Sequence, residues 1–336
     1  YVVKNYPNTL EARTSLERIE SIYTNQGKTD EYEVYVKSVP NYSKGQYYFD
    51  SLAYRAALNK YQSSNYASAI TEFTKYLNKY KNGIFQIESH YYRAASYEAI
   101  NKISEAILDY KFVADARIND FAERSIYKTA KLSKEKLDDN TAFIYYGKWE
   151  ALVKNNKDLA EAVYEQLRIL HAANNISKAK PKASQLLFNV EANAYMKKEA
   201  NLVLAKSYIN DSLLNTAIAT LKKVIDGSTT ILGAEGKYLE SCCYFELGEL
   251  DKCKQGIIEI NKKFSGYDYW LGKSLLLLSD YYVAKDDAFS AKSTLNSILA
   301  NFDDERILSK AREKLAAIEK GNARLNNINN LAPGKG

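Results

Sequence analysis

Apolar side chains recur along this chain at the spacing of amphipathic helices, and a small residue marks the centre of each apolar stripe. In residues 61–77 the stripe contains Ala69, Phe73 and Tyr76, which fall on one face of a helix. The small residue returns every 36 to 38 residues, as Ala69, Ala106, Ala142, Ala179, Ala217, Cys253 and Ala291. The pattern therefore predicts an internal repeat over most of the chain.

A second, mostly small position lies twelve residues before each of these sites. It is occupied by Ala57, Ala94, Ala130, Leu167, Ala205, Ser241 and Ser279. Turn-prone residues such as Ser64 and Gly248 separate the two positions, so one helix can end there before the next begins. Each unit is predicted to be a helical hairpin whose two backbones approach closely through small side chains.

These residues resemble the tetratricopeptide repeat, most clearly in residues 91–113. Ala94, Tyr97, Ala106 and Tyr110 stand where that family places a small residue, a tyrosine, an alanine and an aromatic residue. The resemblance implies an all-α fold, a right-handed α-solenoid of about eight hairpins with a C-terminal capping helix. A solenoid of this kind needs a terminal helix with a polar outer face.

The repeat pattern also gives the predicted domain limits. Pro7 resembles the family's proline near the end of a repeat, and Ile307, Ala311, Leu315 and Ile318 share one face of a final helix. The predicted segments are the end of a preceding repeat (1–8), the solenoid (9–303), the capping helix (304–325) and a flexible tail (326–336).

Two units depart from the pattern. The first is weak, with Tyr23 and Gly27 before a second helix near Tyr32. In the unit around Ala179, Pro181 falls inside the expected second helix, so we expect that helix to start late or to kink.

Composition and charge narrow the possible partners. The 47 basic and 41 acidic residues are intermixed and give a net charge of +6, which favours a solvated surface and no nucleic-acid partner. No apolar run approaches the roughly 20 residues of a membrane-spanning helix. The three cysteines are expected to be small helix residues, with a Cys242–Cys253 disulfide as the alternative in an oxidising compartment.

The sequence offers little for catalysis. His90 and His171 are isolated in the sequence, and no glycine-rich phosphate loop follows a strand. We therefore expect no enzyme activity, no cofactor and no metal site, and we expect structural roles for both histidines and a core position for Trp149.

Tyrosines supply the candidate binding residues. The fifth position of the first helix commonly faces the concave surface in tetratricopeptide proteins, and Leu202 and Leu276 occupy it in two units. In the other units it is Tyr54, Tyr91, Tyr127, Tyr164 and Tyr238. Tyrosine offers apolar area and a hydroxyl at low entropic cost, which suits a partner-binding groove, while packing between repeats is the alternative role.

A narrower resemblance suggests a cellular setting. Residues 54–80 resemble the repeats of bacterial cell-envelope proteins of the Tol-Pal coordinator and outer-membrane assembly lipoprotein types, and residues 267–302 resemble long repeat proteins of Bacteroidota. These resemblances imply a periplasmic, possibly outer-membrane-associated protein. The expected function is a non-enzymatic protein-interaction scaffold in a multi-component envelope complex, and the alternative is a protein that binds a glycan or peptide in the tyrosine groove.

Overall fold

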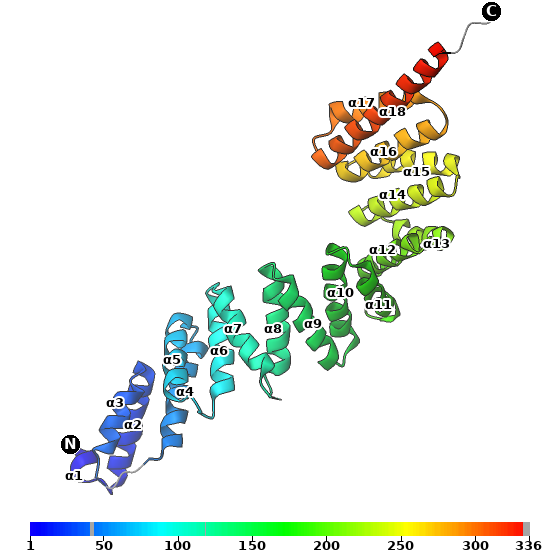
Figure 1. Cartoon of the computed structure of the whole chain (residues 1–336). Coiled ribbons are helices and arrows are strands. Elements are labelled where there is room, and N and C mark those ends of the chain that lie inside the picture. The colour runs from blue at the N-terminus through cyan, green and yellow to red at the C-terminus, as the bar shows by residue number, and fades with distance from the viewer. Residues whose placement is uncertain (41–43, 118, 332–336) are drawn as a thin grey trace, which may run out of the picture. The chain divides into compact units, whose positions relative to one another are not determined.

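The computed structural model of the chain describes residues 1–40, 44–117 and 119–331, with side chains up to residue 321 (Figure 1). These residues form eighteen α-helices and no strand, which confirms the all-α prediction. The helices are α1 (Val2–Asn5), α2 (Leu10–Gln26), α3 (Thr29–Lys37), α4 (Gln46–Gln62), α5 (Tyr66–Lys79), α6 (Gln86–Ala99), α7 (Ile103–Asp115), α8 (Ala122–Glu135), α9 (Asp139–Leu152), α10 (Asn156–Ala172), α11 (Ile176–Phe188), α12 (Ala194–Asn210), α13 (Leu214–Ile225), α14 (Ile231–Glu246), α15 (Leu250–Lys263), α16 (Asp268–Ala284), α17 (Ala288–Asn301) and α18 (Glu305–Leu331).

Eight helical hairpins follow one another, from α2 and α3 to α16 and α17, as predicted. The chain divides into two compact units, Tyr1–Ala162 (unit 1) and Val163–Gly336 (unit 2), and the boundary falls within α10. Inside each unit the first helices of neighbouring hairpins contact each other directly, as α4 contacts α6 and α14 contacts α16. The first helices of a unit therefore form one layer, and second helices such as α5, α7 and α13 pack against the first helix of their own hairpin and that of the next.

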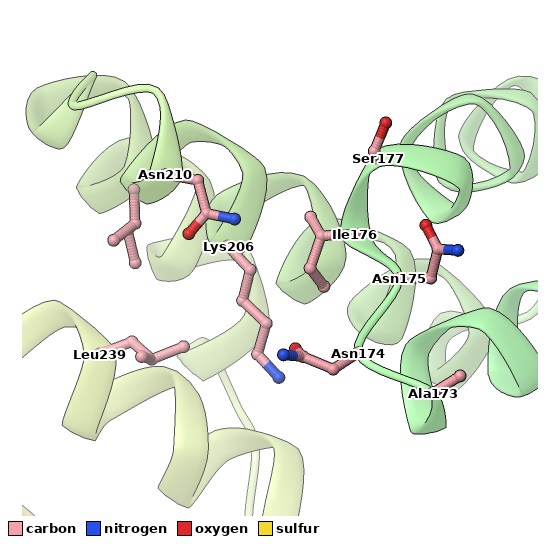
Figure 2. A pocket seen from close by; sticks show the side chains of 9 residues that line it. Ala173, Asn174, Asn175, Ile176, Ser177, Lys206, Asn210 and Leu239 are labelled. Carbon is pink, nitrogen blue, oxygen red and sulfur yellow. The ribbon is translucent and has the colours of Figure 1, made fainter.

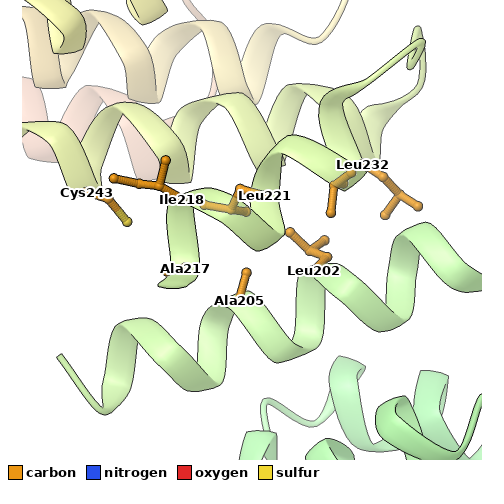
Figure 3. Close-up of a cluster of buried hydrophobic side chains, with 8 residues drawn as sticks. Leu202, Ala205, Ala217, Ile218, Leu221, Leu232 and Cys243 are labelled. Carbon is orange, nitrogen blue, oxygen red and sulfur yellow. The ribbon is translucent and has the colours of Figure 1, made fainter. Parts of the chain in front are cut away.

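The predicted small residues lie where the two helices of a hairpin meet. In the hairpin of α12 and α13, Ala205 and Ala217 are both fully buried, and the larger Leu202 and Leu221 fill the space beside them (Figure 3). The seven small sites from Ala69 to Ala291 are all fully buried, which confirms this part of the prediction. Small side chains here let two backbones approach, and larger neighbours restore dense packing.

Every hairpin turn contains one residue in the left-handed conformation. These residues are Gly27, Ser64, Asn101, Leu137, Asn174, Ser212, Gly248 and Asp286, with φ between 53° and 74°. The amide of the next residue donates back to a carbonyl of the first helix, as Asn175 does to Leu170 over 2.8 Å. This is the Schellman ending of a helix, and it sets the sharp reversal between the two helices.

Two irregular units behave differently from one another. In the first hairpin Tyr32 is completely buried at the place that small residues occupy elsewhere, five residues after the left-handed Gly27. In α11 the prediction of a late start was wrong, because the helix begins at Ile176 and continues through Pro181. Pro181 is exposed, so its ring meets no neighbouring helix, and the missing amide would have bonded only to the carbonyl of Ser177.

The C-terminal helix packs through the predicted face. Ile307 and Ala311 are buried, and Leu315 and Ile318 pack against the same cluster. The helix is longer than predicted, since α18 runs to Leu331 and takes in the first part of the segment expected to be a flexible tail. Residues 332–336 lie outside the described part of the chain. In the described ranges, none of the helices combines the length and the apolar content needed to cross a bilayer.

The three cysteines are free thiols in this structure, so the Cys242–Cys253 disulfide is not formed. Cys243 and Cys253 are buried, and burial raises the pKa of both thiols to about 12. A thiol with such a pKa is almost entirely protonated at neutral pH and is a poor nucleophile. Both side chains act as small packing residues, as the sequence indicated.

Candidate functional site

The predicted tyrosine column lies in the first-helix layer, and its first two members pack onto the next hairpin. The ring of Tyr54 stacks on Phe85 with a centroid distance of 4.3 Å and an interplanar angle of 4°. The ring of Tyr91 contacts Phe121 with a centroid distance of 4.5 Å, but the two rings are tilted by 38°. Tyr54 and Tyr91 are only 8% and 7% exposed, so a partner could reach little more than the edges of these rings.

The other three tyrosines use their hydroxyl groups or ring faces to contact the next hairpin. The hydroxyl of Tyr127 donates a hydrogen bond to Glu161 Oε1 over 3.2 Å, and the hydroxyl of Tyr164 donates one to Glu199 Oε2 over 2.8 Å. Lys273 lies 4.6 Å from the centre of the Tyr238 ring. All five tyrosines therefore join neighbouring hairpins within a unit, and their role in partner binding stays a prediction.

A row of ionisable side chains crosses the first-helix layer of unit 2. We call it the polar row; its members are Tyr164 and His171 of α10, Glu199 and Lys206 of α12, and Glu235 of α14. Lys206 Nζ lies 2.7 Å from His171 Nε2, and His171 Nδ1 lies 3.3 Å from Glu199 Oε1. Because an ammonium group can only donate, Nε2 is the acceptor, and the hydrogen of the neutral imidazole is on Nδ1, which donates to Glu199.

The two carboxylates of the polar row have different partners. Burial alone would raise the pKa of Glu199, but hydrogen bonds from His171 and Tyr164 outweigh it and hold that pKa below its ordinary value. Burial, followed by the charge of Glu199, raises the pKa of Tyr164, which keeps its hydroxyl a donor. Glu235 pairs with Lys206 over 2.5 Å. The row is thus a chain of satisfied donors and acceptors.

An open pocket of about 620 Å³ lies beside the polar row in unit 2. It is bounded by the turn between α10 and α11, by α12 and by α14, and its wall includes Asn174, Ile176, Lys206, Ile209, Asn210 and Leu239. Figure 2 shows the Lys206 side chain extending from α12 toward Asn174 on the turn. Asn174 and Asn210 are exposed, so the pocket offers two carboxamides and an ammonium group next to aliphatic side chains.

The second histidine belongs to a separate cluster in unit 1. His90 and Arg93 of α6 both contact Asp109 of α7, with Arg93 Nε and Nη2 2.7 and 2.8 Å from its two carboxylate oxygens. The same two residues hold the pKa of Asp109 below its ordinary value, although burial opposes them. His90 also stacks on Phe112. This cluster joins the two helices of one hairpin, which agrees with the structural role predicted for His90.

Sequence reasoning missed the polar row and the pocket. Both were hidden because their members come from different hairpins, such as His171 and Lys206, which are 35 residues apart. Trp149 is buried, as predicted. Among the residues that the structure describes, no group of three or more histidine, cysteine or acidic side chains is placed to hold a metal ion.

No protein-family model matches this sequence, and no curated protein matches it either. Among solved structures, the C-terminal part of a TPR repeat-containing protein from Cytophaga hutchinsonii is 16% identical, with a TM-score of 0.50, covering 76% of this chain and 98% of that one. A tetratricopeptide repeat protein from Parabacteroides merdae is 13% identical, with a TM-score of 0.38, covering 80% and 98%. YrrB, a TPR protein with an unusual peptide-binding site, is 16% identical, with a TM-score of 0.43, covering 59% and 95%.

Proposed function

We propose that this chain, which has the fold of a tetratricopeptide-repeat solenoid, is a non-enzymatic scaffold that binds an extended segment of a partner protein at the pocket of unit 2. The observation that carries the proposal is the mixed wall of that pocket. A carboxamide both donates and accepts, as a peptide group does, so Asn174 and Asn210 suit the backbone of an extended segment. Ile176, Ile209 and Leu239 supply apolar area for its side chains.

Several features support a scaffold over an enzyme. The ionisable groups beside the pocket are bound to one another, and none of them is left as an activated nucleophile or a base facing the opening. The wall is built on packed helices and a fixed left-handed turn, so little ordering accompanies binding. A contact with the half-buried Tyr238, which also belongs to unit 2, is part of the same proposal as a secondary site.

The proposal is tested by affinity capture of the partner with the full chain and a double variant. Asn174→Gly removes one carboxamide while glycine keeps the left-handed turn, and Asn210→Ala removes the other. The matched control in unit 1 combines Asn101→Gly with Glu135→Ala. Asn101, like Asn174, is the left-handed residue of its turn, and Glu135, like Asn210, lies two residues before the left-handed residue of the next turn. The partner should be lost with the pocket variant and retained with the control.

Retention of the partner by both variants, with folding unchanged by circular dichroism, would refute a contact at this pocket. Release of the captured protein by a soluble oligosaccharide would instead favour the glycan-binding alternative. We chose the peptide because the tyrosine rings that a sugar would need are largely covered by neighbouring hairpins.

We further propose that the partner belongs to a bacterial envelope complex and that the protein acts in the periplasm, in association with the outer membrane. The support is the resemblance of residues 54–80 to the repeats of envelope proteins. Cell fractionation followed by immunodetection tests this placement. Recovery with periplasmic or outer-membrane markers is expected, and recovery with a cytosolic marker alone would refute it.

A further inference from the structure

Lys273 of α16 lies among three aromatic rings at one end of the first-helix layer of unit 2. Its ammonium nitrogen is 4.6 Å from the ring centre of Tyr238, 5.2 Å from that of Trp270 and 5.6 Å from that of Tyr269. The side chain is half-buried. Cation–π contacts of this kind hold an ammonium group in place but do not neutralise its charge.

The charges around Lys273 are paired with other residues. The carboxylate of Glu235, whose charge influences the pKa of Lys273, forms an ion pair with Lys206 over 2.5 Å. The carboxylate of Asp280 forms an ion pair with Lys314. In the described part of the chain no carboxylate lies within ion-pair distance of Lys273. Burial lowers the pKa of Lys273 and outweighs Cys242 and Glu235, which act in the opposite direction, while the ammonium of Lys206 reinforces the effect of burial. Lys273 is thus a half-buried cation that has no carboxylate partner among the described residues.

We propose that Lys273 is a binding subsite for the carboxylate of an aspartate or glutamate side chain in the partner segment. This inference rests on the proposed function, because Leu239 lines the pocket and the preceding residue, Tyr238, supplies one of the rings that Lys273 contacts. A segment lying in the pocket can extend along the first-helix layer to Lys273. The carboxylate supplies the counter-ion that the protein itself does not provide.

The aromatic surroundings favour an acidic peptide over an acidic sugar. The three rings keep water away from one side of the ammonium group, and a partly desolvated ion pair is stronger than one in water. A sugar ring would need a free aromatic face to stack on, whereas the ammonium group of Lys273 already covers these rings. A ligand therefore interacts with Lys273 mainly through the positive charge of its ammonium group.

The test uses the fluorescence of Trp270, which becomes the single tryptophan in a Trp149→Phe background. The probes are two nonapeptides with blocked ends, one alternating glycine with glutamate and the other glycine with glutamine. The glutamate peptide should change the Trp270 emission in a saturable way, and the glutamine peptide should bind about tenfold more weakly or worse. Equal affinities for the two peptides would overturn the proposal.

Two lysine variants assign the effect to Lys273. Lys273→Met keeps the aliphatic stem over the rings and should abolish the preference for glutamate, while Lys273→Arg should retain it. Lys254→Met is the matched control, because Lys254 is also half-buried and lies 5.3 and 5.9 Å from the Tyr281 and Tyr282 rings. Loss of the preference in the control, or its persistence in Lys273→Met, would contradict the assignment.

A third probe, trigalacturonate, separates the two classes of acidic ligand. Tighter binding of this acidic sugar than of the glutamate peptide would overturn the choice of a peptide.

Failure of the Lys273 subsite can be distinguished from failure of the proposed function. If the pocket variant loses the native partner but the two nonapeptides bind equally, the scaffold function is supported and the Lys273 subsite is refuted. If the pocket variant retains the native partner, the binding of the partner at the pocket is refuted, whatever the nonapeptides do.

Discussion

The two units of the chain use the same hairpin, but Tyr54 in unit 1 and Tyr164 in unit 2 join neighbouring hairpins through different contacts. In unit 1, Tyr54 of one hairpin stacks on Phe85 at the start of the next. In unit 2, Tyr164 at the same repeat position donates a hydrogen bond to Glu199, which belongs to the polar row. The composition follows this division, because 20 of the 29 tyrosines lie in residues 1–162 and nine in residues 163–336.

This difference shows which part of the repeat is fixed and which part varies. The contact within a hairpin is the same in both units, with Ala69 completely buried in unit 1 and Ala217 in unit 2. At the repeat position shared by Tyr54 and Tyr164, the contact between hairpins is a ring stack for Tyr54 and a hydrogen bond to a carboxylate for Tyr164. Ring contacts respond little to salt or pH, whereas a polar network responds to both, so solution conditions should alter the polar row of unit 2 more than the Tyr54–Phe85 stack of unit 1.

The largest effect is expected from removing an aromatic ring that joins hairpins of unit 1. Tyr92 lies 5.0 Å from Tyr61, 6.3 Å from Phe73 and 5.9 Å from Phe121. Tyr92→Ala should lower the free energy of unfolding by about 3 kcal/mol, because ring packing is lost across three hairpins. Urea unfolding measures the loss, and hydrogen exchange should place it in unit 1.

The same helix position in unit 2 is the control for this prediction. It is occupied by Leu239, whose aliphatic side chain makes no ring–ring contact. Leu239→Ala should cost less, about 1 to 2 kcal/mol. Equal losses in the two variants would mean that rings are not what distinguishes unit 1.

The next effect tests the feature that the units share. Ala69→Leu in unit 1 and Ala217→Leu in unit 2 should each destabilise the chain by about 1 to 3 kcal/mol, because the added side chain forces two closely packed helices apart. Thermal or urea unfolding of both variants measures the cost. A variant that unfolds together with the parent would show that its hairpin does not depend on close backbone approach.

The sequence predicted the hairpins well because their small residues recur at a fixed spacing and pack within one hairpin. It predicted the turns only in part. Gly248 signals a left-handed residue, but Leu137 and Ser212 adopt the same conformation with side chains that rarely do. At those turns the Schellman hydrogen bonds and the packing of the two helices decide the backbone, and local preference does not.

The candidate site was much less predictable. His171 looked isolated because its partners, Glu199 and Lys206, lie 28 and 35 residues further along the chain. Which side chains meet across hairpins depends on how neighbouring first helices are placed, and no local pattern reports this. The tyrosine column was visible for the opposite reason, since it repeats at one position, yet its packing role became clear only once its neighbours were placed.

The third prediction concerns pH and the polar row. The folded pKa of Glu199 lies below its unfolded value, which is about 4.3 for glutamate. The stabilisation is therefore complete above that pH and is lost as the pH falls through the folded pKa. Glu199→Gln should cost about 1 to 2 kcal/mol at pH 7, and its difference from the parent should shrink below about pH 4.

A variant of unit 1 sharpens this comparison. Phe85→Leu weakens the stacking on Tyr54 without changing any charge, so its cost should be the same at pH 4 and pH 7. Urea unfolding of both variants at a series of pH values provides the measurement. A pH-dependent cost for Phe85→Leu, or a constant cost for Glu199→Gln, would contradict the division between ring contacts and polar contacts.

The smallest effect is expected at the turns and should have the opposite sign. Leu137 has φ of 61° and is 87% exposed, so its side chain strains the backbone and buries almost no apolar surface in return. Leu137→Gly should raise the free energy of unfolding by about 1 kcal/mol, since glycine adopts this conformation without strain. In unit 2, Asn174→Gly should change stability by only a few tenths of a kcal/mol, because asparagine tolerates the left-handed region far better than leucine. Urea unfolding of the two variants separates them. A loss of stability in Leu137→Gly would mean that its turn is held by contacts of the leucine side chain, and the eight turns would then not be equivalent across the two units.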